Sequence, residues 1–415
     1  MINISQKIQE LSDTAAEKSA ESFKRIDAVT QLNQRRVLAS FIDNRVSESH
    51  FAASTGYGYG DRGKQVLYST WADAFGAEDA IVSYDFASGT HTLSVMLFGM
   101  LRPGDTLLCL NGMPYDTILP VMGLSQGSTG SLKEYGITVK CVDLLADGSA
   151  DLCGIKESVA QLKPAAVYIQ RSRGYTLRPS LTNEKIAEIV SSVRCVNGSV
   201  PVLLDNCYGE FTETSTPFEA GADICAGSLI KNAGGGIARR GGYIAGKSEY
   251  VNRCSYRLTC PGLGSEVGAT LESKREIFMG LFHAPHVTGE AMKAAVFASA
   301  LFTELGYECS PRPEDARADI IESILLGSEK KLIAFCRGLQ SGSAVDSFVT
   351  PEPCAMPGYD SRVIMAAGAF TLGSSIELSA DAPLREPYAV WMQGGLNFHS
   401  ARAGLELAAQ AVLDC

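Results

Sequence analysis

The sequence predicts an α/β protein in which a mostly parallel, seven-stranded sheet flanked by helices is followed by a smaller α+β region. The first observation is an alternation of short apolar runs with helical stretches between residues 80 and 245. Such alternation is typical of a parallel sheet with right-handed crossovers and helices on both faces. The second is a change after about residue 285, where Pro-rich loops follow a long helical stretch. The third is the length of 415 residues, too long for one compact core.

The predicted strands of the sheet are seven short apolar runs. They are expected at 80–84, 106–110, 138–142, 165–169, 202–205, 224–228 and 242–245. Helices are expected at 89–101, 114–122, 152–162 and 182–194, and an amphipathic helix is expected before the first strand at 5–28. Because ligands of such sheets bind beyond the carboxyl ends of the strands, we look there for the functional site.

The C-terminal region is expected to be a smaller α+β unit. A helix at 287–306 precedes strands at 344–349, 362–366 and 375–378, and a last helix begins at about 400. We therefore predict an N-terminal helical segment at 1–50, a large domain at 51–285 and a small domain at 286–415. Two long polar and glycine-rich loops, at 44–64 and 350–361, are expected to be functional, since long loops between domains seldom lack a role.

Composition excludes several classes of protein. The net charge is −10 and its charges are scattered, which argues against nucleic-acid or membrane-surface partners. No apolar run approaches the roughly 20 residues that span a bilayer, and the N-terminus lacks a signal-peptide core. Twelve cysteines without a Cys-x-x-Cys pair predict a reduced, cytoplasmic protein. The pair His283 and His286 lacks recognisable partner ligands, so no metal is expected.

Lys231 and Asp205 are the two residues that indicate a chemistry. Asp205 closes the apolar run at 201–204, and Lys231 follows the run at 223–228 and precedes three glycines. The Schiff base of pyridoxal 5'-phosphate (PLP) requires such a pair, because the lysine forms the imine and the carboxylate keeps the pyridine nitrogen protonated. Alone, the aspartate is often a helix cap and the lysine a solvated loop residue. Together they predict PLP bound covalently to Lys231, with both residues catalytic.

The stretch Ser88, Gly89 and Thr90 follows the first strand of the predicted sheet and opens a helix. The unpaired N–H groups and partial positive charge of a helix start can hold a phosphate dianion. The alternative is an ordinary helix cap without a ligand. His91 either stacks on a cofactor ring or packs beneath it.

Two aromatic features add candidate contacts. Tyr115 begins a helix after a strand, where its ring can stack on a planar cofactor or serve only as a hydrophobic staple. Tyr57, Tyr59 and Arg62 lie in the glycine-rich loop 56–63, which is costly to order. We expect this loop to contact a ligand or another subunit, with Arg62 forming a charge-assisted fork to phosphate or carboxylate.

These residues resemble the fold-type I PLP enzymes of cystathionine and methionine metabolism. The sequence Asp205-Asn206-x-Tyr208 is similar to that family's strand end, and Ser228-x-x-Lys231 to its serine and Schiff-base lysine. The chain resembles most specifically the bacterial cystathionine beta-lyase-like or methionine gamma-lyase-like proteins that are linked by name to aluminium resistance. Five motifs carry this resemblance, at 56–59, 88–91, 170–175, 234–236 and 378–388.

The resemblance implies a role for each of these residues. Tyr115 is expected to stack on the PLP ring and to act as a general acid, and Ser88, Gly89, Thr90 and His91 to form the phosphate loop. Tyr208 and Ser228 are further expected cofactor contacts. Tyr59 and Arg62 approximate a Tyr-x-Arg phosphate motif that a neighbouring subunit supplies, which implies a homodimer or homotetramer with composite active sites.

One departure from the family concerns the substrate. Better-characterised relatives hold the substrate carboxylate with an arginine at the position of Glu377. We therefore expect the carboxylate at Arg385, or at Arg173 or Arg171, with Tyr57 also at the substrate. The threonine usually found beside the lysine is Ile230 here, which removes one phosphate contact.

The predicted function is a PLP-dependent carbon–sulfur lyase acting on a small sulfur amino acid, by elimination of the cystathionine beta-lyase or methionine gamma-lyase type. One alternative keeps PLP and changes the reaction to aldol cleavage, decarboxylation or transamination. Another is a PLP-binding stress-response protein without enzymatic activity. The retention of Lys231, Asp205 and Tyr115 argues against the last.

Overall fold

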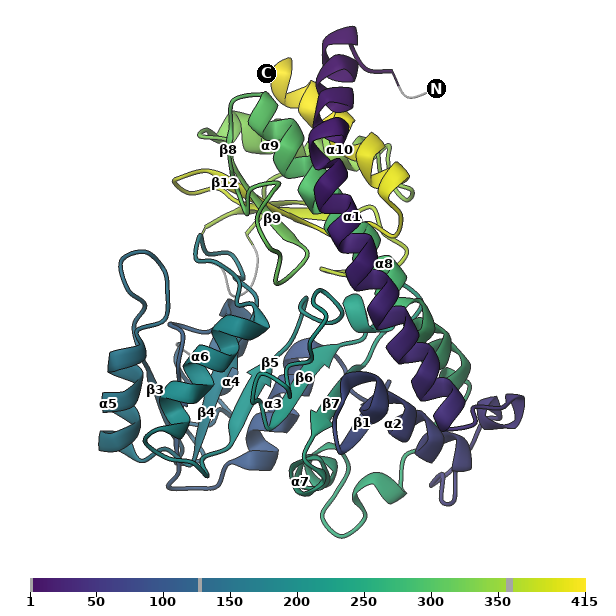
Figure 1. Cartoon of the computed structure of the whole chain (residues 1–415), viewed down its shortest axis with the longest axis vertical. Helices are drawn as coiled ribbons and strands as arrows, with labels where there is room; N and C mark the ends of the chain where they lie inside the picture. Colours follow the sequence, from purple (N-terminus) through teal and green to yellow (C-terminus); the bar gives the residue numbers. More distant parts are fainter. Residues whose placement is uncertain (1–2, 126–128, 356–360) are drawn as a thin grey trace.

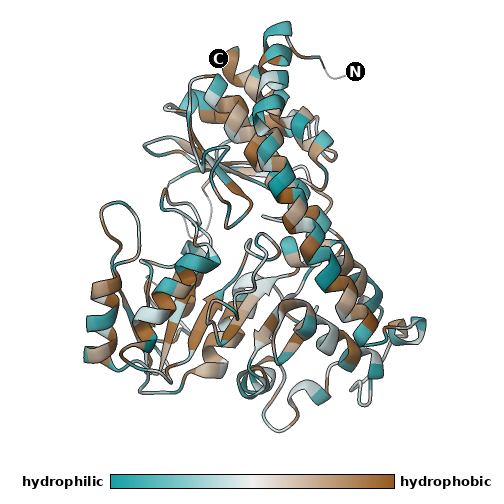
Figure 2. Cartoon of the chain, in the orientation of Figure 1, coloured by the Kyte–Doolittle hydropathy of each residue, from teal (hydrophilic) through white to brown (hydrophobic). Residues whose placement is uncertain are grey.

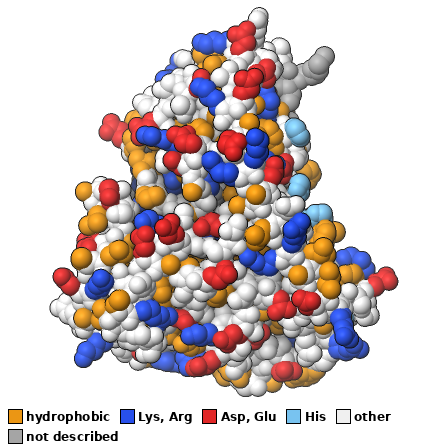
Figure 3. Space-filling model, viewed as in Figure 1, with side chains coloured by type: hydrophobic (Ala, Val, Ile, Leu, Met, Phe, Trp, Pro, Cys, Tyr) orange, Lys and Arg blue, Asp and Glu red, His pale blue; other side chains and the backbone are white. Residues whose placement is uncertain are grey.

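The computed structural model describes residues 3–125, 129–355 and 361–415. Two sheets form the body of the protein, and a long N-terminal helix runs along both of them (Figure 1). Part of the predicted loop 350–361 lies outside the described residues. Lys and Arg side chains are interspersed with Asp and Glu over the face in Figure 3, so the scattered charges of the sequence are scattered on this face too.

The larger sheet has seven strands in the order β1-β7-β6-β5-β4-β2-β3. β7 is antiparallel to both of its neighbours, β1 and β6, and the other pairs are parallel. The predicted seven-stranded, mostly parallel sheet is therefore confirmed. Its strands are β1 (Asp79–Ser83), β2 (Thr106–Cys109), β3 (Thr138–Cys141), β4 (Ala166–Gln170), β5 (Val202–Asp205), β6 (Ile224–Ser228) and β7 (Gly242–Gly246).

Helices cover both faces of this sheet because its central strands are apolar on both sides. Successive residues such as Leu107 and Leu108, or Leu203 and Leu204, belong to different cores. Figure 2 shows the corresponding brown interior between amphipathic helices. One core packs α2 (Arg62–Phe75), α5 (Leu152–Leu162) and α6 (Asn183–Arg194), and the other packs α3 (Gly89–Met100), α4 (Leu119–Met122) and α7 (Ser248–Leu258). Short 3-10 turns are Glu48–Phe51, Asp116–Ile118, Asn232–Gly234 and Gly264–Glu266.

The smaller sheet has five antiparallel strands in the order β10-β11-β12-β9-β8. Its elements are β8 (Glu308–Ser310), β9 (Ile321–Leu325), β10 (Val363–Ala366), β11 (Ser379–Pro383), β12 (Ala389–Gln393), α9 (Glu329–Ser341) and α10 (Phe398–Leu413). The strand predicted at 362–366 is confirmed, but those at 344–349 and 375–378 are wrong. The first is a turn in which Asp346 has a φ of 54° and Phe348 is 86% exposed. The second precedes β11, whose residues Ser-Ala-Asp-Ala-Pro lack the β-branched side chains that mark a strand.

Two long helices join the sheets. α1 (Gln6–Asp43) and α8 (Ser273–Glu304) lie side by side (Figure 1), and both are longer than the sequence predicts. The buried positions of α1 include polar residues such as Ser19 and Asn33. The helical spacing of apolar residues in the sequence therefore ends before the helix itself ends. The predicted domain boundary at 285 falls inside α8, at Pro285. The division into domains stays a prediction.

Candidate active site

A cavity of about 390 Å³ lies at the carboxyl ends of the parallel strands, between the two sheets. This is the place where sheets of this class bind ligands. The larger sheet and its loops supply Ser88, Gly89, Thr90, Tyr115, Asp205, Tyr208, Ser228 and Lys231 to the wall, and the smaller sheet supplies Ile321, Trp391 and Gln393. The structure therefore brings together most of the residues that the sequence selected for a cofactor.

Lys231 follows β6 and points its amine into this cavity region. Its Nζ lies 3.4 Å from the centroid of the Tyr208 ring. Tyr208 itself has a left-handed backbone with φ 69°, and its hydroxyl donates to the Ser374 carbonyl at 3.2 Å. Burial lowers the pKa of the Lys231 amine, because a charged ammonium is poorly solvated there. This direction favours the neutral amine, which is the nucleophilic form of lysine.

Asp205 ends β5, the parallel neighbour of β6, and is 6% exposed. The Cys207 amide donates to Oδ1 at 3.1 Å, and the Tyr168 hydroxyl donates to Oδ2 at 3.4 Å. Burial raises the pKa of this carboxyl group, and the nearby Lys231 acts in the opposite direction. The negative charge of a carboxylate buried in this way is stabilised by a neighbouring group that is positively charged and donates a hydrogen bond.

The start of α3 forms one end of the cavity. Ser88 caps the helix by accepting from the His91 amide at 3.1 Å, so its side chain is occupied. A Cβ on Gly89 would lie 3.1 Å from the Ser228 Cβ, which is tighter than most such contacts, so glycine favours this close approach of the helix to β6. Ser228 is 1% exposed, and its hydroxyl has no hydrogen bond with any described residue. Thr90 is held by a 2.9 Å hydrogen bond between its hydroxyl and that of Thr117.

His91 lies behind this end of the cavity. Its Nδ1 accepts from the Ala87 amide at 3.0 Å, and its ring meets Phe86 edge-on at 6.1 Å. His91 is not one of the described residues that line the cavity. Its position is that of a residue supporting the loop before α3.

An aromatic wall closes the side of the cavity towards the smaller sheet. Tyr175 contacts Tyr115 edge-on at 5.7 Å and Trp391 at 5.8 Å. The Tyr175 hydroxyl donates to Asp381, which is 4% exposed and whose pKa is raised by burial. Neither Trp391 nor Asp381 was predicted to have a role. Only the motifs at 170–175 and 378–388 marked the segments of Tyr175 and Asp381.

The three arginines expected at the substrate lie elsewhere. Arg171 is 2% exposed, and its guanidinium pairs with Glu213 at 2.5 Å. Arg173 donates to the Ser310 carbonyl at 2.8 Å and to the Ser323 hydroxyl at 2.9 Å. Arg385 is exposed between β11 and β12. Among the described residues, none of these three lines the cavity, whereas Arg239 and Arg240, which the sequence analysis missed, do.

Glu377, at the position of the family's arginine, supports a loop instead. Its carboxylate is 6% exposed and accepts from the amides of Phe370 at 2.9 Å and Thr371 at 2.7 Å. Leu372, which follows Thr371 in this loop, lines the cavity. Glu377 therefore shapes the wall through the backbone of this loop.

The loop with Tyr57, Tyr59 and Arg62 lies outside the cavity of its own chain. The two tyrosines are 72% and 60% exposed and stack with ring centroids 5.6 Å apart. Asp61 fixes the loop by accepting from Ser54, Thr270 and the buried Lys274. Burial alone would raise the pKa of Asp61, but these hydrogen bonds lower it. Arg62 is exposed at the start of α2.

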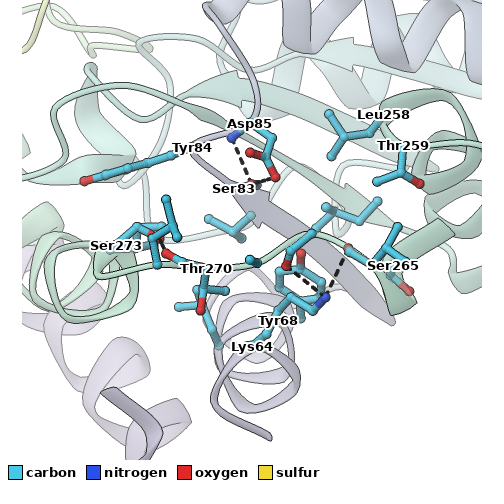
Figure 4. A pocket seen from close by; sticks show the side chains of 18 of the residues that line it. Lys64, Tyr68, Ser83, Tyr84, Asp85, Leu258, Thr259, Ser265, Thr270 and Ser273 are labelled. Atoms are coloured by element: carbon cyan, nitrogen blue, oxygen red, sulfur yellow. Dashed lines mark hydrogen bonds between the residues drawn. The ribbon is translucent and has the colours of Figure 1, made fainter. Parts of the chain in front are cut away.

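A second cavity, of about 520 Å³, lies beside β1 and the segment 264–273 (Figure 4). Its buried lysine, Lys64, donates to the carbonyls of Val267 at 3.1 Å and Gly268 at 3.4 Å. That amine is therefore engaged with the backbone, as the dashed lines in Figure 4 show. The Lys231 amine lies over the Tyr208 ring and has no side-chain hydrogen bond to a described residue, so Lys231 is the better candidate for covalent chemistry.

No group of three or more His, Cys, Asp or Glu side chains in residues 3–125, 129–355 and 361–415 is arranged to hold a metal ion. In the same ranges, no helix is long and apolar enough to cross a membrane.

Comparison with known proteins decides the family. The methionine gamma-lyase family model matches residues 8–413. The chain belongs to this family. It is 44% identical to the uncharacterised protein YnbB of Bacillus subtilis over 408 residues, which cover 97% of each chain.

Solved structures of family members share the whole architecture. A carbon-sulfur lyase involved in aluminium resistance from Clostridium novyi is 46% identical, with a TM-score of 0.95 over 99% of this chain and 96% of that one. A proposed cystathionine beta-lyase involved in aluminium resistance from Clostridium acetobutylicum is 48% identical, with a TM-score of 0.96 over the same shares. Cystathionine gamma synthase from Xanthomonas oryzae, 16% identical, has a TM-score of 0.60 over 92% of this chain and 98% of its own, which shows likeness of fold. The predicted fold-type I class is confirmed.

Proposed function

We propose that this protein is a PLP-dependent carbon–sulfur lyase that acts on a sulfur amino acid, with Lys231 as the covalent attachment point. The observation that carries the proposal is the pair Lys231 and Asp205. Asp205 ends β5 and Lys231 follows the adjacent parallel strand β6. Both face one cavity, where Asp205 is buried and Lys231 is half-buried. The carbon-sulfur lyase of Clostridium novyi supports the reaction class.

The residues of the cavity fit PLP. The free Ser228 hydroxyl and the close approach of Gly89 leave room and donors for a phosphate at the start of α3. Asp205 suits a protonated pyridine nitrogen, because a positive partner would offset the cost of burying its carboxylate, and the Tyr115 ring suits a planar neighbour. When bound, PLP supplies an electron sink for the carbanion at the substrate Cα.

The chain's own groups then account for binding and proton transfer. Lys231 would hold the cofactor through its amine and, once released, take the proton from the substrate Cα. Asp205 would keep the proton on the pyridine nitrogen. Tyr115 would stack on the ring and give a proton to the departing sulfur. The aromatic wall with Tyr175 and Trp391 would hold the substrate side chain and keep water out.

Assembly and location complete the proposal. The exposed Tyr57 and Tyr59 on a firmly held loop favour a homodimer or homotetramer in which this loop reaches the active site of a second copy. All twelve cysteines are free, which favours a cytoplasmic location.

Two measurements test the function. The purified protein is expected to be yellow, and borohydride reduction with peptide mapping should place the pyridoxyl group on Lys231. Lys231→Ala should lose the colour. A panel of sulfur amino acids then gives the reaction, because β-elimination releases pyruvate and γ-elimination releases 2-oxobutyrate. An adduct on another lysine, or a loaded protein that releases no keto acid from the panel, would overturn the proposal.

A further inference from the structure

The loop between β6 and β7 brings two adjacent arginines to the wall of the cavity, Arg239 and Arg240. Arg239 is already paired. Its Nε donates to Glu276 at 3.0 Å, and its Nη2 lies 2.8 Å from the same carboxylate. For Arg240, no hydrogen bond or ion pair joins the guanidinium to any residue that the structure describes. The charge of Arg239 is therefore neutralised by Glu276, whereas the charge of Arg240 can be paired with a ligand in the cavity.

Arg240 lies at the same end of the cavity as Ser228. The antiparallel register pairs Ser228 with Gly242, and the Leu229 amide donates to the Gly241 carbonyl at 3.0 Å. Ser228 in turn abuts Gly89 at the start of α3. The start of α3, the Ser228 hydroxyl and the β6–β7 loop that carries Arg240 thus meet at one end of the cavity.

We propose that Arg240 binds the phosphate group of the cofactor, so that the chain holding PLP through Lys231 also supplies the phosphate's positive charge. This rests on the proposed function, since it requires PLP in the cavity. A helix start and a serine hydroxyl bring only partial charges to a dianion, whereas a guanidinium brings a full charge and a two-pronged donor. Arg62, which the family resemblance implies for this contact, is exposed outside the cavity of its own chain and requires a second copy.

The test compares PLP with pyridoxal, which has the same ring and aldehyde but no phosphate. Dissociation constants are measured by absorbance titration of the full-length protein stripped of cofactor. Arg240→Gln is expected to weaken PLP binding roughly 10- to 100-fold, the range for loss of one charge-assisted contact. Its affinity for pyridoxal should stay within about twofold of wild type. Arg240→Lys keeps a point charge without the fork, so its PLP affinity should fall between the two.

Arg239→Gln is the matched control, because it removes the same charge from the same loop but from a residue paired with Glu276. Its ratio of PLP to pyridoxal affinity should stay near that of wild type. The inference is overturned if Arg240→Gln leaves this ratio unchanged or weakens both ligands equally. It is also overturned if Arg62→Gln alone removes the preference for PLP. Failure of the proposed function is separate, since wild type would then give no pyridoxyl adduct on Lys231.

Discussion

The hydroxyl of Tyr175 donates a hydrogen bond to Asp381 across the cleft between the two sheets. Tyr175 lies in the segment after β4 of the larger sheet, and Asp381 lies in β11 of the smaller one. The Trp391 indole donates to the Thr176 carbonyl at 3.3 Å beside it. The segment after β4 is thus tied to the smaller sheet at the wall of the cavity.

Tyr175→Phe should lower the free energy of unfolding by about 1–3 kcal/mol, because a buried acceptor loses its donor. Asp381 would keep only the weaker contact with the Ser374 hydroxyl, at 3.4 Å. Urea unfolding of the cofactor-loaded protein measures the change. Tyr135→Phe is the control, since Tyr135 is 53% exposed, and it should change stability by less than about 0.5 kcal/mol. Equal stabilities for the two variants would contradict a structural role for the Tyr175 hydroxyl.

Asp205→Asn should still bind PLP but lose turnover. An Asn oxygen can still accept from the Cys207 amide, so the local backbone should hold. The neutral amide cannot keep the pyridine nitrogen protonated, and the electron sink is lost. We expect kcat to fall at least about 100-fold, the scale for removal of one preorganised electrostatic contact. Absorbance titration checks binding, and keto-acid release checks kcat. A variant with nearly wild-type rate would reduce Asp205 to a turn-stabilising residue.

The larger sheet could be predicted from sequence because its strands are continuous apolar runs that are buried on both faces. Each run, such as the apolar part of β5 that precedes Asp205, differs clearly from the polar residues on either side of it. The smaller sheet could not be predicted so well. Its β11 is built of Ser, Ala, Asp and Pro, and its burial comes from the sheet and helices around it. Likewise, α1 presents serines to its neighbours where periodicity analysis looks for apolar residues.

Some residues of the candidate site could likewise be predicted from the sequence, and others could not. Lys231, Asp205 and Ser88 were predictable because each follows a recognisable strand, and strand ends converge in this fold. Arg240 gave no comparable signal, because its place at the cavity depends on the β6–β7 pairing. The arginine chosen for the substrate carboxylate, Arg385, sits on an exposed turn, and its role stays a prediction. The sequence position of Arg385 could not show whether this turn lies at the cavity or away from it.

Replacement of both Tyr57 and Tyr59 by Ser should weaken self-association. The wild-type protein is expected to be at least a dimer by light scattering at micromolar concentration. Stacked aromatic rings that are mostly exposed on a fixed loop are typical of an interface, because their burial is favourable and little ordering is needed. Tyr135→Ser serves as the control for loss of an exposed tyrosine. A monomeric wild type with activity intact would contradict the predicted oligomer.

Glu210→Gln should stabilise the protein at alkaline pH. Glu210 is 1% exposed, accepts from the Tyr243 hydroxyl at 2.8 Å, and burial raises its pKa from 4.5 to about 7. The folded state therefore binds the proton more tightly than the unfolded state. Its contribution to stability is complete below about pH 4.5 and is lost as the pH rises through about 7.

Gln stays neutral at every pH, so the variant should match wild type near pH 4 and exceed it near pH 8. The gain should reach up to roughly 3 kcal/mol in the free energy of unfolding, from about 1.4 kcal/mol per unit of pKa. Urea unfolding at both pH values tests this. Glu322→Gln provides the contrast, because the pKa of Glu322 is also raised to about 7 by burial but its carboxylate pairs with Arg317 at 2.6 Å. That variant leaves a buried cation without its partner wherever Glu322 is ionised, so it should be destabilised near pH 8, where Glu210→Gln is stabilised. A Glu210→Gln variant whose stability parallels that of wild type across this range would show that folding does not raise the pKa of Glu210.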